Sequence, residues 1–171
     1  MTSPATVLAA PAAELRNIYL HPGQIATSAT PCMISTILGS CVAVCLWDEE
    51  TGIGGMNHFL LPHFAGSGPS SARFGNVAIE QLVSRLLAAG ARKGGMRAKL
   101  FGGANVLEAL RGVAGSLGRS NVEVARLVLK EAGIPVVAED VEGDRGRKLI
   151  FQTNDGSARV KLLSGERHAI A

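Results

Sequence analysis

Cys41, His58 and a hydroxyl group shortly before Cys41 are the residues of this chain whose types and spacing could support nucleophilic catalysis. Cys41 follows Gly39 and Ser40 at the start of an apolar run, so a sharp bend there would project the thiol from a rigid strand. A thiol with its reference pKa of about 8.5 is mostly protonated at neutral pH, and a hydrogen-bonded imidazole can take that proton. The pattern therefore predicts attack of the Cys41 sulfur on a carbonyl carbon.

A hydroxyl that orients the imidazole would complete the set, and Ser35 and Thr36 compete for that role. Side chains alternate along a strand, so only one of the two can face the site. Backbone N–H groups of the bend, including those of Ser40 and Cys41, could stabilise an oxyanion, and Gly39 would leave room for a substrate carbonyl. The competing interpretation is an inert buried thiol, a core histidine and ordinary strand hydroxyls.

The elements that must position these residues are mostly strands in the first third of the chain. Strands are expected over 32–38 and 41–47, on either side of the Gly-Ser bend, and over 53–61, which contains His58. The other expected elements are strands at 24–28, 98–101 and 135–139, helices at 76–89, 105–112 and 120–133, the last opened by a capping box at Ser120, and a hairpin of 149–152 with 157–163. This order predicts an α/β fold of the α+β type, a single domain with a mixed, largely antiparallel sheet and flanking helices.

Length and composition predict one domain and exclude several classes of protein. With 171 residues, of which 47% are hydrophobic, the chain can bury a sizeable core. We expect the domain over 16–165, between a loose N-terminal extension at 1–15 and a C-terminal tail at 166–171. The net charge of +3 comes without a concentrated basic stripe, which argues against nucleic-acid binding. Without a signal peptide or a long apolar run, a cytoplasmic location and no membrane insertion are expected.

The three cysteines are Cys32, Cys41 and Cys45. An odd number without a secretion signal argues against a disulfide framework. Together with His58 and His63 they offer a conceivable zinc site. However, zinc sites usually contain tight pairs such as CxxC, which this sequence lacks. We therefore expect no metal and no other cofactor.

Two further motifs have competing interpretations. The pair Gly102-Gly103 lacks the spacing of a phosphate-binding loop, so a tight turn that lines the substrate cleft is expected instead. Arg145 and Arg147 lie in a glycine-rich turn, where they are either ordinary turn charges or contacts for a docked partner.

Seven segments carry a family resemblance: YLHPG at 19–23, LGSCVAVCLWD at 38–48, GGMNHFLLP at 54–62, RFGNVA at 73–78, KLFGGA at 99–104, GRSN at 118–121 and GDRGR at 143–147. In this order they resemble the CheD family, the chemoreceptor glutamine deamidases of bacterial chemotaxis. The likeness extends from about residue 18 to about residue 163. Phe74 stands where many members of the family have Tyr.

The resemblance implies a Cys-His-Thr triad on an α/β sandwich. Cys41 and His58 fall on the family nucleophile and histidine, and the third position maps to Ser35, with Thr36 as the competing candidate. The implied activity is hydrolysis of specific receptor glutamines to glutamate through a thioester, with release of ammonia and a side activity on glutamate methyl esters. The implied partners are the helical bundle of a methyl-accepting chemotaxis receptor and a CheC-type phosphatase. The alternative is a non-catalytic module that regulates such a phosphatase.

Overall fold

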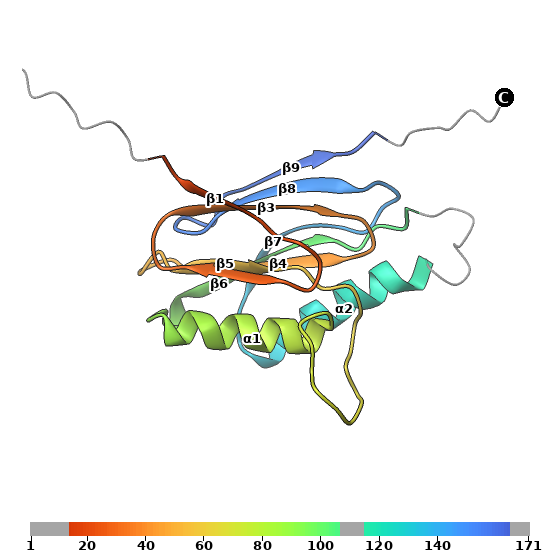
Figure 1. Ribbon diagram of the computed structural model, residues 1–171, viewed down its shortest axis with the longest axis horizontal. Helices are drawn as coiled ribbons and strands as arrows, with labels where there is room; N and C mark the ends of the chain where they lie inside the picture. Colours follow the sequence, from red (N-terminus) through yellow and green to blue (C-terminus); the bar gives the residue numbers. More distant parts are fainter. Residues whose placement is uncertain (1–13, 107–114, 165–171) are drawn as a thin grey trace, which may run out of the picture.

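The computed structural model describes residues 14–106 and 115–164. Two sheets stack face to face, and the two described α-helices lie against the outer side of one of them (Figure 1). The elements are β1 (Arg16–Tyr19), β2 (Ile25–Ser28), β3 (Cys32–Leu38), β4 (Val42–Asp48), β5 (Gly54–Asn57), α1 (Gly75–Ala88), the 3-10 helix η1 (Lys93–Gly95), β6 (Met96–Gly102), α2 (Gly115–Glu131), β7 (Val136–Val141), β8 (Arg147–Gln152) and β9 (Ala158–Leu162). The α+β sandwich predicted from the sequence is confirmed. The helix expected at 105–112 lies mostly outside the described residues.

The upper sheet in Figure 1 has the strand order β1-β3-β8-β9. Its β1–β3 pair is parallel, and the other two pairs are antiparallel. The predicted hairpin is confirmed as β8 and β9. Its turn includes Gly156, which has φ +73° and packs so closely against Trp47 that a Cβ atom there would lie 2.1 Å from the indole ring. A side chain at this position would therefore be strained and would clash.

The second sheet has the order β2-β5-β4-β6-β7, with one parallel pair, β6–β7. Both sheets are thus mixed and largely antiparallel, as predicted. The two apolar strands on either side of the Gly-Ser bend do not pair, because the bend at 39–41 carries the chain from one sheet into the other. Every residue of β4 is buried, because this central strand is covered by helices on one face and by the other sheet on the opposite face.

Two apolar clusters fill the layers. One lies between the second sheet and the helices, and it contains the predicted stripe of α1, including Ile79, Leu82 and Leu86. The other lies between the two sheets and includes Ile34, Leu38 and Phe151. Fully burying an aliphatic or aromatic side chain of this size contributes roughly 1.5–3 kcal/mol, so these layers hold the strands that carry Cys41 and His58.

The capping box predicted at Ser120 is wrong, because α2 already includes Gly115 and Ser120 lies inside it. The position of α2 depends on a close backbone approach. A Cβ atom on Gly118 would lie 2.4 Å from the carbonyl oxygen of Gly103. Packing of α2 against the loop after β6 therefore determines where this helix lies. A local capping pattern does not reveal such packing.

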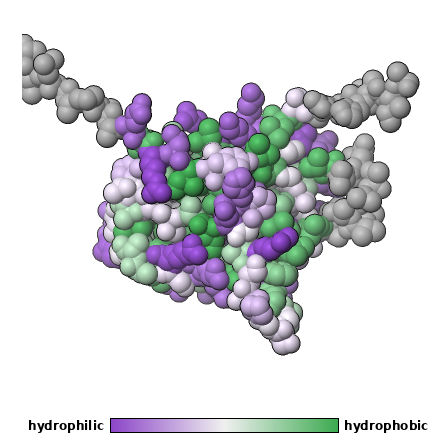
Figure 2. Space-filling view, in the orientation of Figure 1, coloured by the Kyte–Doolittle hydropathy of each residue, from purple (hydrophilic) through white to green (hydrophobic). Residues whose placement is uncertain are grey.

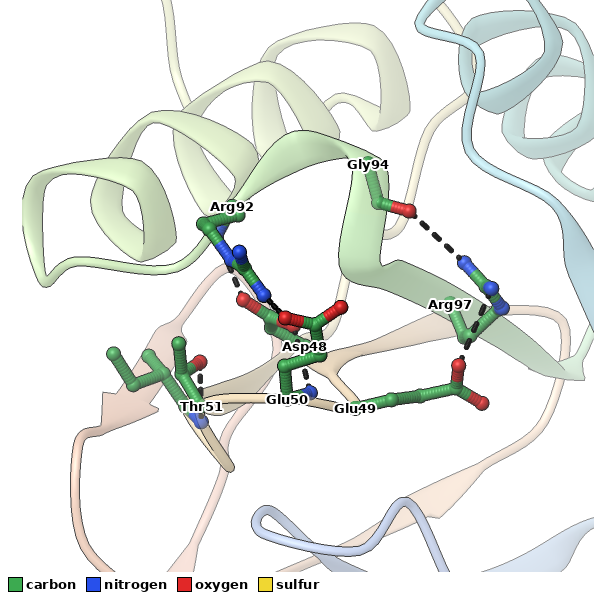
Figure 3. Close-up of polar contacts among 8 residues, drawn as sticks. Asp48, Glu49, Glu50, Thr51, Arg92, Gly94 and Arg97 are labelled. Atoms are coloured by element: carbon green, nitrogen blue, oxygen red, sulfur yellow. Dashed lines mark hydrogen bonds and ion pairs between the residues drawn. The ribbon is translucent and has the colours of Figure 1, made fainter.

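The end of β4 far from Cys41 is held by paired charges (Figure 3). The buried Asp48 carboxylate accepts the backbone N–H groups of Glu50 at 3.0 Å and of Arg92 at 2.7 Å. On the surface beside it, Arg97 pairs with Glu49 at 3.2 Å, and Arg92 also pairs with Glu50. These contacts join the β4–β5 turn to η1.

Hydrophobic and hydrophilic side chains are intermingled on the face of the molecule seen in Figure 2. The most exposed large apolar residues of the described chain come from several elements: Tyr19, Ile37, Leu61, Leu87, Val106, Leu127, Val137 and Leu162. Within residues 14–106 and 115–164, no helix has both the length and the apolar character needed to cross a bilayer.

Candidate active site

Cys41 lies in the bend between β3 and β4, where its thiol is half-buried. The backbone of the bend is held from behind by the loop after β6. The Gly39 carbonyl accepts the N–H of Ala104, and the Cys41 carbonyl accepts the N–H of Gly103, both at 2.9 Å. The bend predicted from Gly39 and Ser40 therefore exists, and it is anchored through its carbonyl groups.

Two N–H groups of the bend, those of Ser40 and Cys41, are not engaged by backbone carbonyls in the described part of the chain. At Gly39 a Cβ atom would lie 3.4 Å from a methyl group of Val106, so a side chain there would narrow the approach to the bend. This arrangement supports the predicted oxyanion-binding role of the bend.

Backbone pairing places Cys41 and His58 on the same face of the second sheet. Val42 and Phe59 exchange two hydrogen bonds of 3.1 and 2.9 Å, and both of their side chains face the helices. Because side chains alternate, their neighbours Cys41 and His58 face the other sheet. Diagonal neighbours of an antiparallel pair are roughly 7–8 Å apart, within reach of long side chains. The geometry therefore allows the imidazole to approach the thiol.

Thr36 contacts the imidazole from the opposite sheet. Its hydroxyl donates to the Leu20 carbonyl at 2.7 Å and lies 2.8 Å from Nδ1 of His58. Since the single hydroxyl hydrogen goes to the carbonyl, Nδ1 must carry a hydrogen and donate to Oγ1. This tautomer leaves the lone pair on Nε2, which is buried and has no partner in the described part of the chain. Nε2 is thus the nitrogen that can accept a proton.

Ser35, to which the resemblance assigns the third position, forms no hydrogen bond with His58 in the described part of the chain, whereas Thr36 does. It lies one residue from Thr36 and so points to the opposite face of β3. Its backbone neighbours are Tyr19 on β1 and Ile150 on β8. The hydroxyl that contacts the imidazole belongs to Thr36, the competing candidate, because the inward-facing residues of β3 are the even-numbered ones.

Burial favours the neutral forms of the Cys41 thiol and the His58 imidazole. It lowers the pKa of His58 from 6.5 to about 4, an effect that the Leu20 carbonyl opposes and the nearby His21 reinforces. It also raises the pKa of the Cys41 thiol, although the backbone N–H of Cys41 partly offsets this. At neutral pH the resting pair is therefore a thiol and a neutral imidazole. If Cys41 acts as a nucleophile, its proton must therefore pass to a base as the sulfur attacks.

Gly102 and Gly103 support the bend from behind. Gly102 has φ +107°, and a Cβ atom on it would lie 2.2 Å from the Cys41 carbonyl oxygen. On Gly103 a Cβ atom would lie 2.5 Å from Val122 of α2. Only glycine allows this approach. That these residues also line a substrate cleft stays a prediction.

The docking interpretation of Arg147 is wrong, because its side chain is buried. Its guanidinium donates to the carbonyl groups of Gly102, Asp140 and Glu142. It therefore ties the loop behind Cys41 to the β7–β8 turn. Arg145 is exposed, and its Nε donates to the Leu163 carbonyl at 3.0 Å.

Cys32 and Cys45 are buried free thiols between the two sheets, and burial raises the pKa of each. In residues 14–106 and 115–164, the structure brings together no group of three or more His, Cys, Asp or Glu side chains that could hold a metal ion. The arrangement that the fold does create is the set of Thr36, Cys41 and His58.

Sequence reasoning assigned no role to Asn121, although it belongs to the GRSN segment. The structure places its side chain in full burial on α2, where Nδ2 donates to the carbonyls of Ser40 and Leu60. A signal was present in the sequence, because Asn121 interrupts the apolar stripe formed by Val122, Ala125 and others. A polar residue within such a stripe needs a specific partner.

Comparisons with known proteins identify the family of this chain. A family model described as "CheD chemotactic sensory transduction" matches residues 60–162. A "probable chemoreceptor glutamine deamidase CheD 1" of Anaeromyxobacter dehalogenans is 56% identical over 146 residues, which are 85% of this chain and 84% of the relative. The CheD proteins of Trichlorobacter lovleyi and Sulfurimonas denitrificans, also named probable chemoreceptor glutamine deamidases, are 47% and 41% identical over 83% and 88% of this chain, and over 88% and 96% of their own lengths. Because these matches cover most of both chains, this protein belongs to the CheD family.

Proposed function

We propose that the protein deamidates glutamine side chains of chemoreceptors, with Cys41 as nucleophile and His58 as general base. The names of its relatives supply the substrate class. The observation that carries the chemistry is the Nε2 atom of His58, which is buried, unpartnered within the described residues and on the same face of the sheet as the thiol. A buried polar atom left without a partner calls for a functional explanation.

In the first half-reaction, Nε2 of His58 takes the Cys41 proton while the sulfur bonds to the carbonyl carbon of the glutamine amide. The negative charge moves to the amide oxygen, where the N–H groups of Ser40 and Cys41 can stabilise it. His58 then gives its proton to the leaving nitrogen, and the carbon–nitrogen bond breaks. The products are ammonia and a thioester on Cys41.

In the second half-reaction, His58 takes a proton from water, and the resulting hydroxide attacks the thioester carbon. The carbon–sulfur bond breaks, the thiol regains its proton, and glutamate is released. Throughout both steps Thr36 keeps Nδ1 of His58 hydrogen-bonded and so maintains the reactive tautomer. A glutamate methyl ester would give the same thioester with methanol as leaving group, so methylesterase activity belongs to this proposal.

The test is mass spectrometry of a receptor cytoplasmic fragment incubated with the protein. Wild-type protein should convert particular glutamines to glutamates, and Cys41→Ala should abolish the conversion while remaining folded. Cys32→Ala is the matched control, because it removes a buried thiol outside the site. Full conversion by folded Cys41→Ala protein would overturn the mechanism.

The non-catalytic alternative makes a different prediction in cells. If the protein acts only by binding a CheC-type phosphatase, Cys41→Ala should restore chemotaxis in a strain that lacks the gene. Under the deamidase proposal it should not, whereas Cys32→Ala should.

A further inference from the structure

We infer that Asn121 is a positioning residue that holds the nucleophile segment and the histidine segment at a fixed separation. This inference rests on the proposed roles of Cys41 and His58. The side chain of Asn121 is fully buried on α2, and its Nδ2 donates to the carbonyl of Ser40 at 2.9 Å and to that of Leu60 at 3.0 Å. Ser40 directly precedes Cys41, and Leu60 follows His58 by two residues. One amide group therefore joins both segments.

The orientation of the amide follows from its neighbours. Both contacts are carbonyl oxygens, which only accept hydrogen bonds, so the NH2 group must face them and use both of its hydrogens. Oδ1 is left buried without a partner among the described residues. Keeping such an atom in an apolar layer costs stability. The bridge therefore needs a reason other than stability, and the position of the two catalytic segments provides one.

The ladder between β4 and β5 is interrupted at this end of the sheet, although β4 stays paired with β6 as far as Val42. Regular pairing of β4 with β5 is continuous only from Trp47 to Cys45. At Val44 the backbone N–H donates at 2.9 Å to the side chain of Asn57. Beyond that point Val42 and Phe59 form an isolated bridge. The Asn121 amide is thus a second tie across a weakened part of the sheet, at the place where the thiol and imidazole must meet.

The experiment that tests this inference replaces Asn121 by Asp. This substitution keeps the shape of the side chain but removes both N–H donors of Nδ2. We expect kcat for glutamine conversion to fall at least tenfold with little change in KM, since the substrate surface is untouched. We also expect alkylation of Cys41 by iodoacetamide, followed against pH, to have an altered profile because the imidazole is displaced. The control is Thr153→Val, which removes a buried hydroxyl that accepts the Cys32 N–H at 3.1 Å.

A purely structural role for Asn121 would lower the thermal midpoint, as the control does, but leave kcat and the pH profile of the folded fraction unchanged. That result would overturn the inference. Asn121→Leu, which adds no charge, repeats the test if the Asp variant does not fold. On wild-type protein, NMR should find both Nδ2 hydrogens of Asn121 protected from exchange, and rapid exchange would contradict the bridge.

The two proposals fail in different ways. Wild-type protein that leaves receptor glutamines unchanged would count against the deamidase. The alkylation profiles of wild-type, Asn121→Asp and Thr153→Val proteins would still show whether the bridge controls the thiol.

Discussion

The two ends of β4 differ in whether their buried polar groups have hydrogen-bond partners. At the Asp48 end, the carboxylate accepts two backbone N–H groups, and neighbouring side chains form ion pairs at the surface (Figure 3). At the Cys41 end lie the four buried side-chain atoms that lack a partner in the described structure. They are Nδ2 of Asn57, Nε2 of His58, Oδ1 of Asn121 and Nε of Arg147.

We propose that one end of this strand is structural and the other functional. Native proteins pair nearly all buried polar groups, so a concentration of exceptions requires an explanation. Here the exceptions belong to side chains that bind backbone groups at the Cys41 end of the strand: Asn57 binds the N–H of Val44, and Arg147 binds the carbonyl of Gly102. We interpret the Asp48 end as stabilising the sheet and the Cys41 end as positioning the proposed catalytic pair, Cys41 and His58.

The largest effect should come from removing the base at the functional end. His58→Ala leaves the Cys41 thiol without its proton acceptor, and we expect the deamidation rate to fall by about 10³-fold or more. The measurement is the initial rate of ammonia release from a receptor fragment, with circular dichroism to confirm folding. Activity within about tenfold of wild type would show that another group serves as base.

The same residue should make stability depend on pH. Because the folded pKa of His58 is about 4 against an ordinary value of 6.5, the unfolded chain binds the proton more readily. The contribution of neutral His58 to the free energy of unfolding is therefore fully present above pH 6.5. This contribution is lost as the pH falls from 6.5 through about 4. At about 1.4 kcal/mol per pKa unit, the loss is of order 3 kcal/mol.

Urea unfolding at several pH values from 7 to 4 would measure this loss, and His58→Gln should remove most of it relative to wild type. An identical pH dependence in the two proteins would show that His58 is not held neutral by burial.

The hydroxyl that orients the imidazole should have a smaller effect on rate. Thr36→Val keeps the shape but removes the acceptor for Nδ1–H, and we expect a loss of roughly tenfold to a hundredfold in kcat, or about 1.4–2.7 kcal/mol. Ser35→Ala, on the opposite face of β3, should stay within about twofold of wild type because its side chain lies away from His58. The reverse ranking, measured by the same assay, would return the third position to Ser35.

The smallest effects on rate should come from the Asp48 end. Asp48→Asn replaces one of the two acceptor oxygens by a donor, so that one of the N–H groups of Glu50 and Arg92 loses its acceptor, and should lower the free energy of unfolding by about 1–3 kcal/mol. Deamidation per folded molecule should stay unchanged. As a control, Glu50→Gln weakens only an exposed ion pair with Arg92 and should change stability by less than about 1 kcal/mol. A large loss of kcat in folded Asp48→Asn protein would remove the distinction between the two ends.

The sequence by itself determined much of the local structure and the family. The spacing of apolar residues predicts α1, and the turn residues at 154–156 predict the β8–β9 hairpin. Both predictions need no distant residues, because helix periodicity and turn chemistry are local. Cys41 and His58 could be named because the motifs around them resemble one family. From the sequence alone, the competing interpretation of an inert thiol and a core histidine stayed open, and the catalytic roles of the two residues are a proposal.

Only the tertiary structure decided which groups meet. The choice of Thr36 over Ser35 as the contact of His58 depends on which face of β3 turns toward the second sheet, and that depends on packing between strands far apart in sequence. The burial of Arg147 and the bridge made by Asn121 have the same origin. Their partners are carbonyl groups, which every residue carries and no sequence pattern can single out.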